Sequence, residues 1–318
     1  MDYKRVEMYV GWTCNQKCTY CMEFPNMERQ WTKRVSKYEI LKKLIKYKKK
    51  WYNHVTYLWW EPFIQEVFWD ALKLAKKLNY TILVTTNCTT LHIEKEAKKY
   101  LPFIDELIIS VEAIDKALQQ KISRTNVFVE WEKVFENISK YWKGGFLKAN
   151  IVITKDNLQE LHNIVIFIVR KWVKNIAITY PDLDIEYYSK KHILERVAPK
   201  YSEAMEKIVK INNFCEQNDI NLKIVDFPFC VFPKDKMEYY IRKTDEIDYA
   251  NRLKVNDILY EDYKIIHWEL DRNDILPRER RHIDKCSWCK YKKLCWWISL
   301  WYKKIYWITE INPIKNEK

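Results

Sequence analysis

Glycine is the residue that this chain most conspicuously lacks. Only 3 of its 318 residues are glycine, about 1%, where roughly 7% is usual. Tryptophan, in contrast, occurs 15 times. Glycine is the default residue wherever a backbone turns left-handed or approaches a ligand closely. The positions at which a fold normally requires glycine are therefore informative here.

Long apolar runs are also missing. No segment is long enough to span a bilayer, and the first residues, MDYKRVEMYV, show no signal-peptide pattern. The 9 cysteines are then expected to serve metal binding or catalysis in a reducing cytoplasm rather than to form disulfides. The 6 histidines are scattered, so the sequence identifies no general base and no catalytic residue.

Positive charge is abundant, with a formal net charge of +13. Such a balance would suit a nucleic-acid or acidic partner. The lysines, however, are spread over amphipathic segments such as KYEILKKLIKYKKK and form no single stripe with interleaved aromatic residues. The pattern favours a solvated lysine-rich surface over nucleic-acid binding.

Helical and extended patterns alternate over about the first 180 residues. The strands have continuous apolar character, which is typical of a parallel sheet covered by helices. Right-handed crossovers curl such a series into a barrel that six units leave incomplete. The predicted fold is α/β, a partial (β/α)6 TIM-type barrel. Its strands are expected at 6–10, 54–58, 80–85, 106–111, 147–153 and 175–180, and its helices at 37–50, 65–78, 94–101, 129–141 and 158–171.

The predicted domain organisation has three parts. The barrel comprises residues 1–190, and a bridging helix and strand at 201–218 and 222–225 occupy residues 191–228. Residues 229–318 are irregular and rich in aromatic residues, and they hold a second group of cysteines. They are expected to form a small C-terminal cysteine-rich domain.

Three cysteines follow the first strand at the spacing C-x3-C-x2-C, namely Cys14, Cys18 and Cys21, with Tyr20 just before the third. They cannot all pair with one another, and no nearby histidine completes a common zinc set. Three thiolates on one loop can each hold one iron of a four-iron cubane and leave the fourth iron open to a small molecule. A zinc knuckle or a chance group of thiols is the alternative.

This loop resembles that of the radical S-adenosylmethionine (SAM) superfamily, whose hallmark is C-x3-C-x-aromatic-C after the first barrel strand. The resemblance implies a [4Fe–4S] cluster whose open iron chelates the amino and carboxylate groups of SAM. It also implies reductive cleavage of SAM to a 5′-deoxyadenosyl radical, which abstracts hydrogen from a substrate. A flavodoxin- or ferredoxin-type protein is the expected reductant.

After the second strand the chain reads Trp59-Trp60-Glu61-Pro62, where radical SAM proteins carry Gly-Gly-Glu-Pro against the methionine end of SAM. Glu61 and Pro62 match, but two indoles in place of glycines are expected to collide with SAM. The resemblance assigns further SAM contacts, for which a strand-end cap, an exposed side chain or a plain core role is the structural alternative. These contacts are Tyr20, Ser110, Glu112, Arg124 and Asn150.

The second cysteine group reads Cys286-x2-Cys289-x5-Cys295, with Cys230 upstream. Four thiolates suit a tetrahedral zinc site or a second cubane equally well. Beside a radical SAM core they resemble the SPASM and twitch extensions, and CSWCKYKKLC is similar to the short form with one auxiliary [4Fe–4S] cluster. Cys88 and Cys215 have no partner at ligand spacing and are expected to be inert buried thiols.

Tryptophan stands at several positions that normally demand glycine. Helix-to-strand junctions usually end in a left-handed residue, mostly Gly and sometimes Asn, and the clearest junctions here carry Trp51, Asn79 and Trp172. We hypothesise that several tryptophans are UGA codons that the source organism reads as glycine. The alternative is a divergent paralogue that has lost SAM. The positions in question are Trp51, Trp59, Trp60, Trp172, Trp296, Trp297, Trp301 and Trp307.

The sequence therefore predicts a cytoplasmic radical SAM enzyme, with no membrane partner, acting most plausibly on a peptide or protein side chain, as families with such extensions do. Two other functions stay open. One is a small-molecule radical SAM dehydrogenase. The other is a non-catalytic metal- or cluster-binding module, if the tryptophans in place of glycine are real.

Overall fold

A computed structural model describes most of the chain in two compact units. The first comprises Met1–Thr19, Glu23–Ala149 and Lys254–Glu269, and the second Tyr20–Met22, Asn150–Leu253 and Leu270–Lys318. The described residues are 4–21, 35–58, 60–181, 195–244, 255–259, 265–267, 280–292, 295, 298–306 and 308–315. The predicted boundary near residue 190 and Trp59, Trp296, Trp297 and Trp307 lie outside them.

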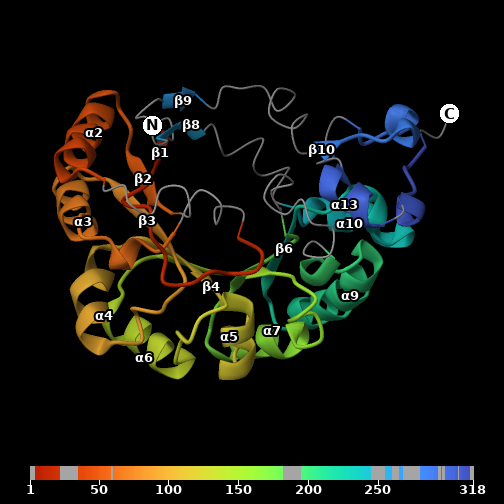
Figure 1. Ribbon diagram of the computed structural model, residues 1–318, viewed down its shortest axis with the longest axis horizontal. Helices are drawn as coiled ribbons and strands as arrows, with labels where there is room; N and C mark the ends of the chain where they lie inside the picture. The colour runs from red at the N-terminus through yellow and green to blue at the C-terminus, as the bar shows by residue number, and fades with distance from the viewer. Residues whose placement is uncertain are drawn as a thin grey trace. The chain divides into compact units, whose positions relative to one another are not determined.

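The first unit alternates strands and helices (Figure 1). Its buried strand residues, such as Val6, Val55 and Ile82, are fully inaccessible, as expected of strands that are covered on both faces. The strands are β1 (Arg5–Met8), β2 (His54–Tyr57), β3 (Thr81–Thr86) and β4 (Glu106–Ser110). The helices are α2 (Lys37–Lys49), α3 (Phe68–Lys77), α4 (Glu94–Tyr100), α5 (Lys116–Ser123) and α6 (Trp131–Tyr141), with short 3-10 turns η1 (Pro62–Ile64) and η2 (Leu101–Phe103).

Two strands that the sequence did not predict extend the sheet of the first unit beyond β1. β8 (Val255–Leu259) pairs with β1 in parallel, and β9 (Ile265–His267) pairs with β8 in antiparallel fashion. They come from the C-terminal part of the sequence, which shows no clear alternating or helical pattern. Their pairing gives β1 a neighbour on each side.

The second unit begins within β5 (Phe146–Val152) and contains β6 (Asn175–Thr179) and β7 (Asn221–Val225), which pair in parallel. Helices α7 (Leu161–Arg170) and α9 (Tyr201–Gln217) connect them. An aromatic core surrounds Tyr180, whose ring lies 5.8 Å from Trp301 and 4.5 Å from Tyr201. The C-terminal part adds η3 (Phe229–Val231), η4 (Lys234–Lys236), α10 (Met237–Arg242), β10 (Arg280–Arg281), η5 (Asp284–Trp288), β11 (Ile298–Ser299), α13 (Leu300–Ile305) and η6 (Ile308–Glu310).

The strand order in the sheet is β7-β6-β5-β4-β3-β2-β1-β8-β9. The first seven strands therefore follow one another in chain order, as successive right-handed β/α units require. The sheet is parallel over these strands and does not close on itself. This confirms the predicted partial TIM-type barrel.

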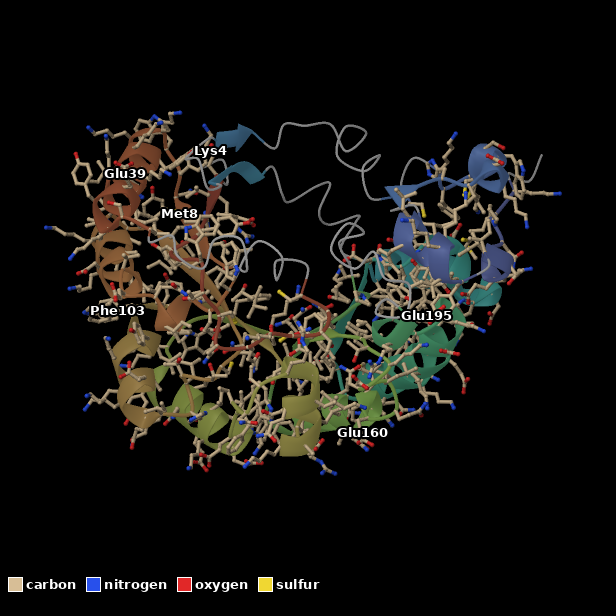
Figure 2. The ribbon with its side chains drawn as sticks, viewed as in Figure 1. Lys4, Met8, Glu39, Phe103, Glu160 and Glu195 are labelled. Carbon is tan, nitrogen blue, oxygen red and sulfur yellow. The ribbon has the colours of Figure 1, made fainter. Side chains whose placement is uncertain are left out.

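Charged side chains cover the outer faces of the helices. Figure 2 shows nitrogen and oxygen tips along the outer sides of α2 and α3, and the ion pair of Lys37 with Asp70 joins these two helices at 2.6 Å. None of the helices in the described ranges is long and apolar enough to cross a membrane.

Four helix-to-strand junctions contain a left-handed residue. The φ angles are 69° at Trp51, 55° at Asn79, 66° at Trp172 and 54° at Asp219. After α2 the amide of Tyr52 donates to Tyr47 O at 3.1 Å, and after α3 the amide of Tyr80 donates to Ala75 O at 3.0 Å. These six-residue loops are Schellman motifs. The predicted left-handed junctions at residues 51, 79 and 172 are confirmed.

We expect Trp51→Gly and Trp172→Gly each to raise the free energy of unfolding by about 1 kcal/mol. A bulky residue is strained at positive φ, and glycine is not. Little packing is lost, because the two side chains are 83% and 88% exposed. Urea unfolding measures the change. Trp51→Ala is the control, since it keeps a Cβ; an equal gain from alanine would contradict backbone strain as the cause.

Candidate active site

The cysteine loop follows β1, at the carboxyl end of that strand, where ligands bind in parallel α/β folds. Cys14 and Cys18 are partly exposed cysteines of the first unit. The amide of Gln16 donates to Sγ of Cys14 at 3.4 Å, and Sγ of Cys18 donates to Oε1 of Gln16 at 3.5 Å. Cys21, which is also partly exposed, and Tyr20 belong to the second unit.

The end of α5 holds this loop in place. The amides of Lys17 and Thr19 donate to the carbonyls of Ser123 and Ile122, at 2.8 and 2.9 Å. Arg124 has a φ of 53°, and its Nε donates to Lys17 O at 2.5 Å. Arg124, which the resemblance gives as a SAM contact, thus also holds the cysteine loop through Lys17.

Glu61 is completely buried at the start of η1. Its Oε1 accepts from Thr86 Oγ1 at 2.9 Å and from the amide of Phe63 at 3.2 Å, and its Oε2 accepts from the amide of Asn87 at 2.8 Å. Burial raises the pKa of this carboxyl from 4.5 to about 7, although the hydrogen bonds oppose the rise. Glu61, a predicted SAM contact, therefore also links η1 to the end of β3 through these hydrogen bonds.

The raised pKa of Glu61 predicts a pH-dependent stability. Between pH 4.5 and 7 the unfolded chain releases the proton that the folded chain still holds, so the free energy of unfolding falls as pH rises, by about 3 kcal/mol in total. We expect Glu61→Gln, which cannot titrate, to lose less stability over the same interval. Urea unfolding of both proteins at pH 5 and pH 7.5 measures the difference. Equal losses would contradict the raised pKa.

Gln65 links the segment around Glu61 to the cysteine loop. Its Nε2 donates to the carbonyls of Thr13 and Glu61, at 2.7 and 2.9 Å. Gly11 permits this approach, because a Cβ there would lie 1.7 Å from Oε1 of Gln65. The sequence analysis did not single out Gln65. The one sequence feature that pointed to a close approach here is Gly11, three residues before Cys14.

Trp60 stands where radical SAM proteins carry the second glycine of their motif. Its φ is 49°, so the backbone adopts a conformation that favours glycine. Its ring packs at 5.0 Å from Tyr9 and 4.7 Å from Trp12. Its Nε1 is buried and makes no hydrogen bond to any of the described residues.

A pocket of the first unit opens beside Cys18, at the carboxyl ends of β3 and β4. Cys18, Ser110 and Glu112 line it together, so the structure brings two predicted SAM contacts to one of the predicted cluster ligands. The rest of the lining is Gln16, Asn87, Ala113, Gln119, Ile122, Ser123, Val129 and Trp131. Asn150 belongs to the second unit, where its Oδ1 accepts from Thr179 Oγ1 at 2.8 Å.

The second cysteine group lines one pocket of the second unit. Cys230 comes from η3 and Cys286 from η5, and Cys289 and Cys295 complete the set. Burial, together with the three neighbouring thiols, raises the pKa of Cys230. Among the described residues no group of three or more His, Cys, Asp or Glu side chains has the spacing of a single-ion site.

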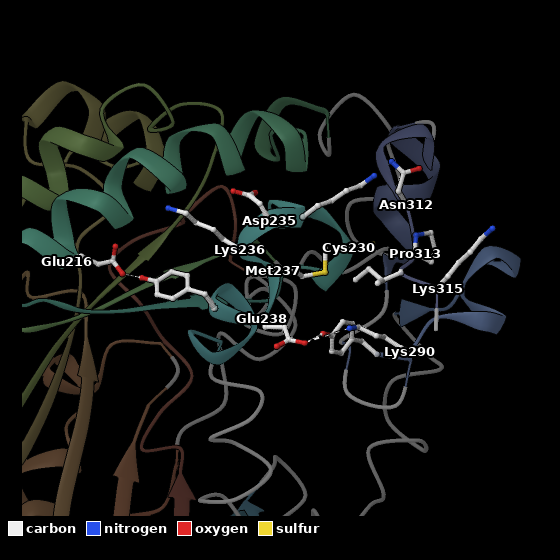
Figure 3. A pocket seen from close by; sticks show the side chains of 14 residues that line it. Glu216, Cys230, Asp235, Lys236, Met237, Glu238, Lys290, Asn312, Pro313 and Lys315 are labelled. Carbon is white, nitrogen blue, oxygen red and sulfur yellow. Dashed lines mark hydrogen bonds and ion pairs between the residues drawn. The ribbon is translucent and has the colours of Figure 1, made fainter. Parts of the chain in front are cut away.

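Cys230 also lines an open groove of the second unit (Figure 3). The figure shows Cys230 beside Met237, between Lys236 on one side and Pro313 on the other. Glu238 in the groove accepts from Tyr291 Oη at 3.3 Å and pairs with Lys290 at 3.7 Å. Cys230, Tyr291 and Pro313 line both this groove and the thiol pocket.

Comparison with solved structures shows the same fold in proteins of low sequence identity. Streptococcus suis SuiB bound to S-adenosylmethionine is 16% identical with a TM-score of 0.57, over 73% of this chain and 53% of that one. SuiB bound to the precursor peptide SuiA is 15% identical with a TM-score of 0.56, over 72% and 50%. Native anSMEcpe with bound AdoMet and Kp18Cys peptide is 15% identical with a TM-score of 0.59, over 97% and 93%. The chain spans about half the length of the SuiB chains.

Comparison with curated proteins finds no match. The family model described as the radical SAM superfamily matches residues 8–168, just over half of the 318 residues. The matched segment includes the three-cysteine loop, Glu61 and the pocket beside Cys18. The chain therefore belongs to the radical SAM superfamily.

Proposed function

We propose that this protein is a radical SAM enzyme that abstracts hydrogen from a peptide or protein side chain. Cys14, Cys18 and Cys21 would hold the [4Fe–4S] cluster, which with bound SAM supplies a 5′-deoxyadenosyl radical. The observation that carries the proposal is the family match over a segment that contains C-x3-C-x-aromatic-C directly after β1.

The residues around Cys18 suit the binding of SAM. Ser110 and Glu112 offer a hydroxyl and a carboxylate to a ribose, in the pocket that Cys18 itself lines. The hydrogen bonds from the end of α5 keep the cysteine loop beside this pocket. These residues bind and orient, while the radical chemistry comes from the cofactor.

A second [4Fe–4S] cluster is proposed on Cys230, Cys286, Cys289 and Cys295. Four cysteines that line one pocket can cap all four irons of a cubane, although zinc takes the same ligand set. Such a cluster could accept an electron from a substrate radical or ligate the substrate.

The peptide substrate is supported by two of the similar structures. One is SuiB bound to the precursor peptide SuiA, and another is anSMEcpe with a bound Kp18Cys peptide. Both have the fold of this chain, and at 15% sequence identity the similarity is evidence of the fold alone. A gene for a short precursor peptide beside this one would strengthen the assignment over a small-molecule dehydrogenase.

A second candidate function rests on Trp60. If its indole is genuine, it fills the space against Tyr9 and Trp12 where the family places a glycine. The protein would then be a non-catalytic module that binds zinc or a cluster without SAM.

Anaerobic purification separates the two functions. An enzyme is expected to be brown, to contain about eight irons per chain, two cubanes' worth, and to release 5′-deoxyadenosine when reduced in the presence of SAM. A colourless protein that holds zinc and leaves SAM intact would support the non-catalytic module and contradict the enzyme.

A further inference from the structure

Asn87 joins the buried Glu61 carboxylate to the cysteine loop. It follows β3 directly, and its main-chain amide donates to Oε2 of Glu61 at 2.8 Å. Its side-chain Nδ2 lies 3.7 Å from Sγ of Cys14 and 3.0 Å from Oδ1 of Asn15. One residue thus contacts both the segment around η1 and a predicted cluster ligand.

The orientation of the Asn87 amide follows from its neighbours. Its oxygen, Oδ1, accepts from the main-chain amide of Thr89 at 3.0 Å and from Thr89 Oγ1 at 2.7 Å. A main-chain amide only donates, so the atom that faces it must be the side-chain oxygen. The NH2 group is therefore the end that points to Cys14, and it can only donate there.

Three side chains form a closed ring of hydrogen bonds around this donor. Asn15 Nδ2 donates to Thr89 Oγ1 at 2.7 Å, Thr89 Oγ1 donates to Asn87 Oδ1, and Asn87 Nδ2 donates back to Asn15 Oδ1. Each side chain in the ring both donates and accepts, so none can rotate without breaking two bonds. The main-chain amide of Thr89 and this ring together orient Nδ2 of Asn87 toward the sulfur of Cys14.

We propose that Asn87 is a positioning residue whose amide donates to the sulfur of Cys14 and thereby raises the reduction potential of the cluster bound there. Hydrogen bonds to the ligand sulfurs are among the factors that set the potential of iron–sulfur clusters. The positive end of an N–H group stabilises the reduced, more negative state. The inference rests on the proposed function, in which Cys14 is a cluster ligand, and it requires no contact of Asn87 with SAM.

The test is a potentiometric titration of the reconstituted protein, monitored by electron paramagnetic resonance. The signal measured is the one that disappears in Cys18→Ser, which assigns it to the cluster on the early cysteines. For Asn87→Ala, the ratio of reduced to oxidised cluster at the parent's midpoint potential should fall at least about tenfold, a shift of about 59 mV for one electron. Asn87→Asp is nearly isosteric and keeps the acceptor for Thr89. It should shift the potential further in the same direction, because it adds a negative charge.

Thr89→Val is the matched control, since it removes the hydroxyl from the ring, while the main-chain amide of residue 89 still donates to Oδ1 of Asn87 and keeps Nδ2 directed at Cys14. It should change the ratio much less than Asn87→Ala does. Titration curves of Asn87→Ala and Asn87→Asp that coincide with the parent's would overturn the inference. A shift in Thr89→Val as large as that in Asn87→Ala would do so too, because packing rather than the donor would then set the potential. A parent that assembles no such cluster overturns the proposed function together with this inference.

Discussion

The double substitution Trp59→Gly/Trp60→Gly is expected to tighten SAM binding by about 5- to 150-fold, the range that corresponds to relieving about 1–3 kcal/mol of overpacking. Trp60 already has the left-handed backbone of a glycine, at φ 49°, and its buried Nε1 makes no hydrogen bond within the described part of the chain. Removal of the indole frees space beside the Glu61 segment without a change of backbone. Isothermal titration of the anaerobic, reconstituted protein with SAM measures the effect.

Trp131 and Trp142, whose indole nitrogens donate hydrogen bonds, serve as controls for replacing a tryptophan that belongs where it is. Trp131 Nε1 donates to Ala113 O at 2.8 Å and Trp142 Nε1 to Ile104 O at 3.0 Å. Trp131→Gly and Trp142→Gly should destabilise the protein, because each leaves a buried carbonyl without its donor. Unchanged SAM affinity in the double variant would contradict the expectation. UGG at codons 59 and 60 of the gene would rule out recoding.

Serine substitutions in the two cysteine groups should have separable effects. We expect Cys18→Ser to remove about four of eight irons and to reduce SAM cleavage to background, because the loop then lacks a cluster ligand. Cys286→Ser should remove the other four irons and leave SAM cleavage without substrate unchanged. Iron analysis and 5′-deoxyadenosine release measure both effects.

Cys88→Ser is the control for loss of a thiol without loss of a ligand. Cys88 is buried, and burial holds its pKa well above the usual range, so it should contribute no iron ligand. Full iron content is therefore expected in this variant. If Cys18→Ser kept all its iron, or if Cys286→Ser abolished SAM cleavage, the assignment of two independent clusters would be wrong.

The barrel and its junctions could be predicted because their signals are local. Continuous apolar strands and amphipathic helices alternate along the chain, and the left-handed junctions at Trp51, Asn79 and Trp172 follow from where each helix ends. The structure adds a distinction among the tryptophans in question. Trp301 lies in α13 at 1% exposure and stacks on Tyr180, so nothing in its backbone requires glycine there.

The features that escaped prediction depend on contacts between distant segments. α5 is short and polar, and only Gln119, Ile122 and Ser123 of its residues are buried, so it has no strong apolar stripe. β8 acquires its strand conformation by pairing with β1, about 250 residues earlier in the chain. The sequence did not single out Asn87, because its hydrogen bonds to Cys14 and Asn15 join residues more than 70 positions apart.

The central claim is that the early cysteines bind a cluster that cleaves SAM. The most direct test is the amount of 5′-deoxyadenosine released when the anaerobic, reconstituted protein with glycine at positions 59 and 60 is reduced in the presence of SAM. We expect release in this protein and none in the same protein carrying Cys18→Ser. Equal release from both, or none from either despite a full iron content, would contradict the claim.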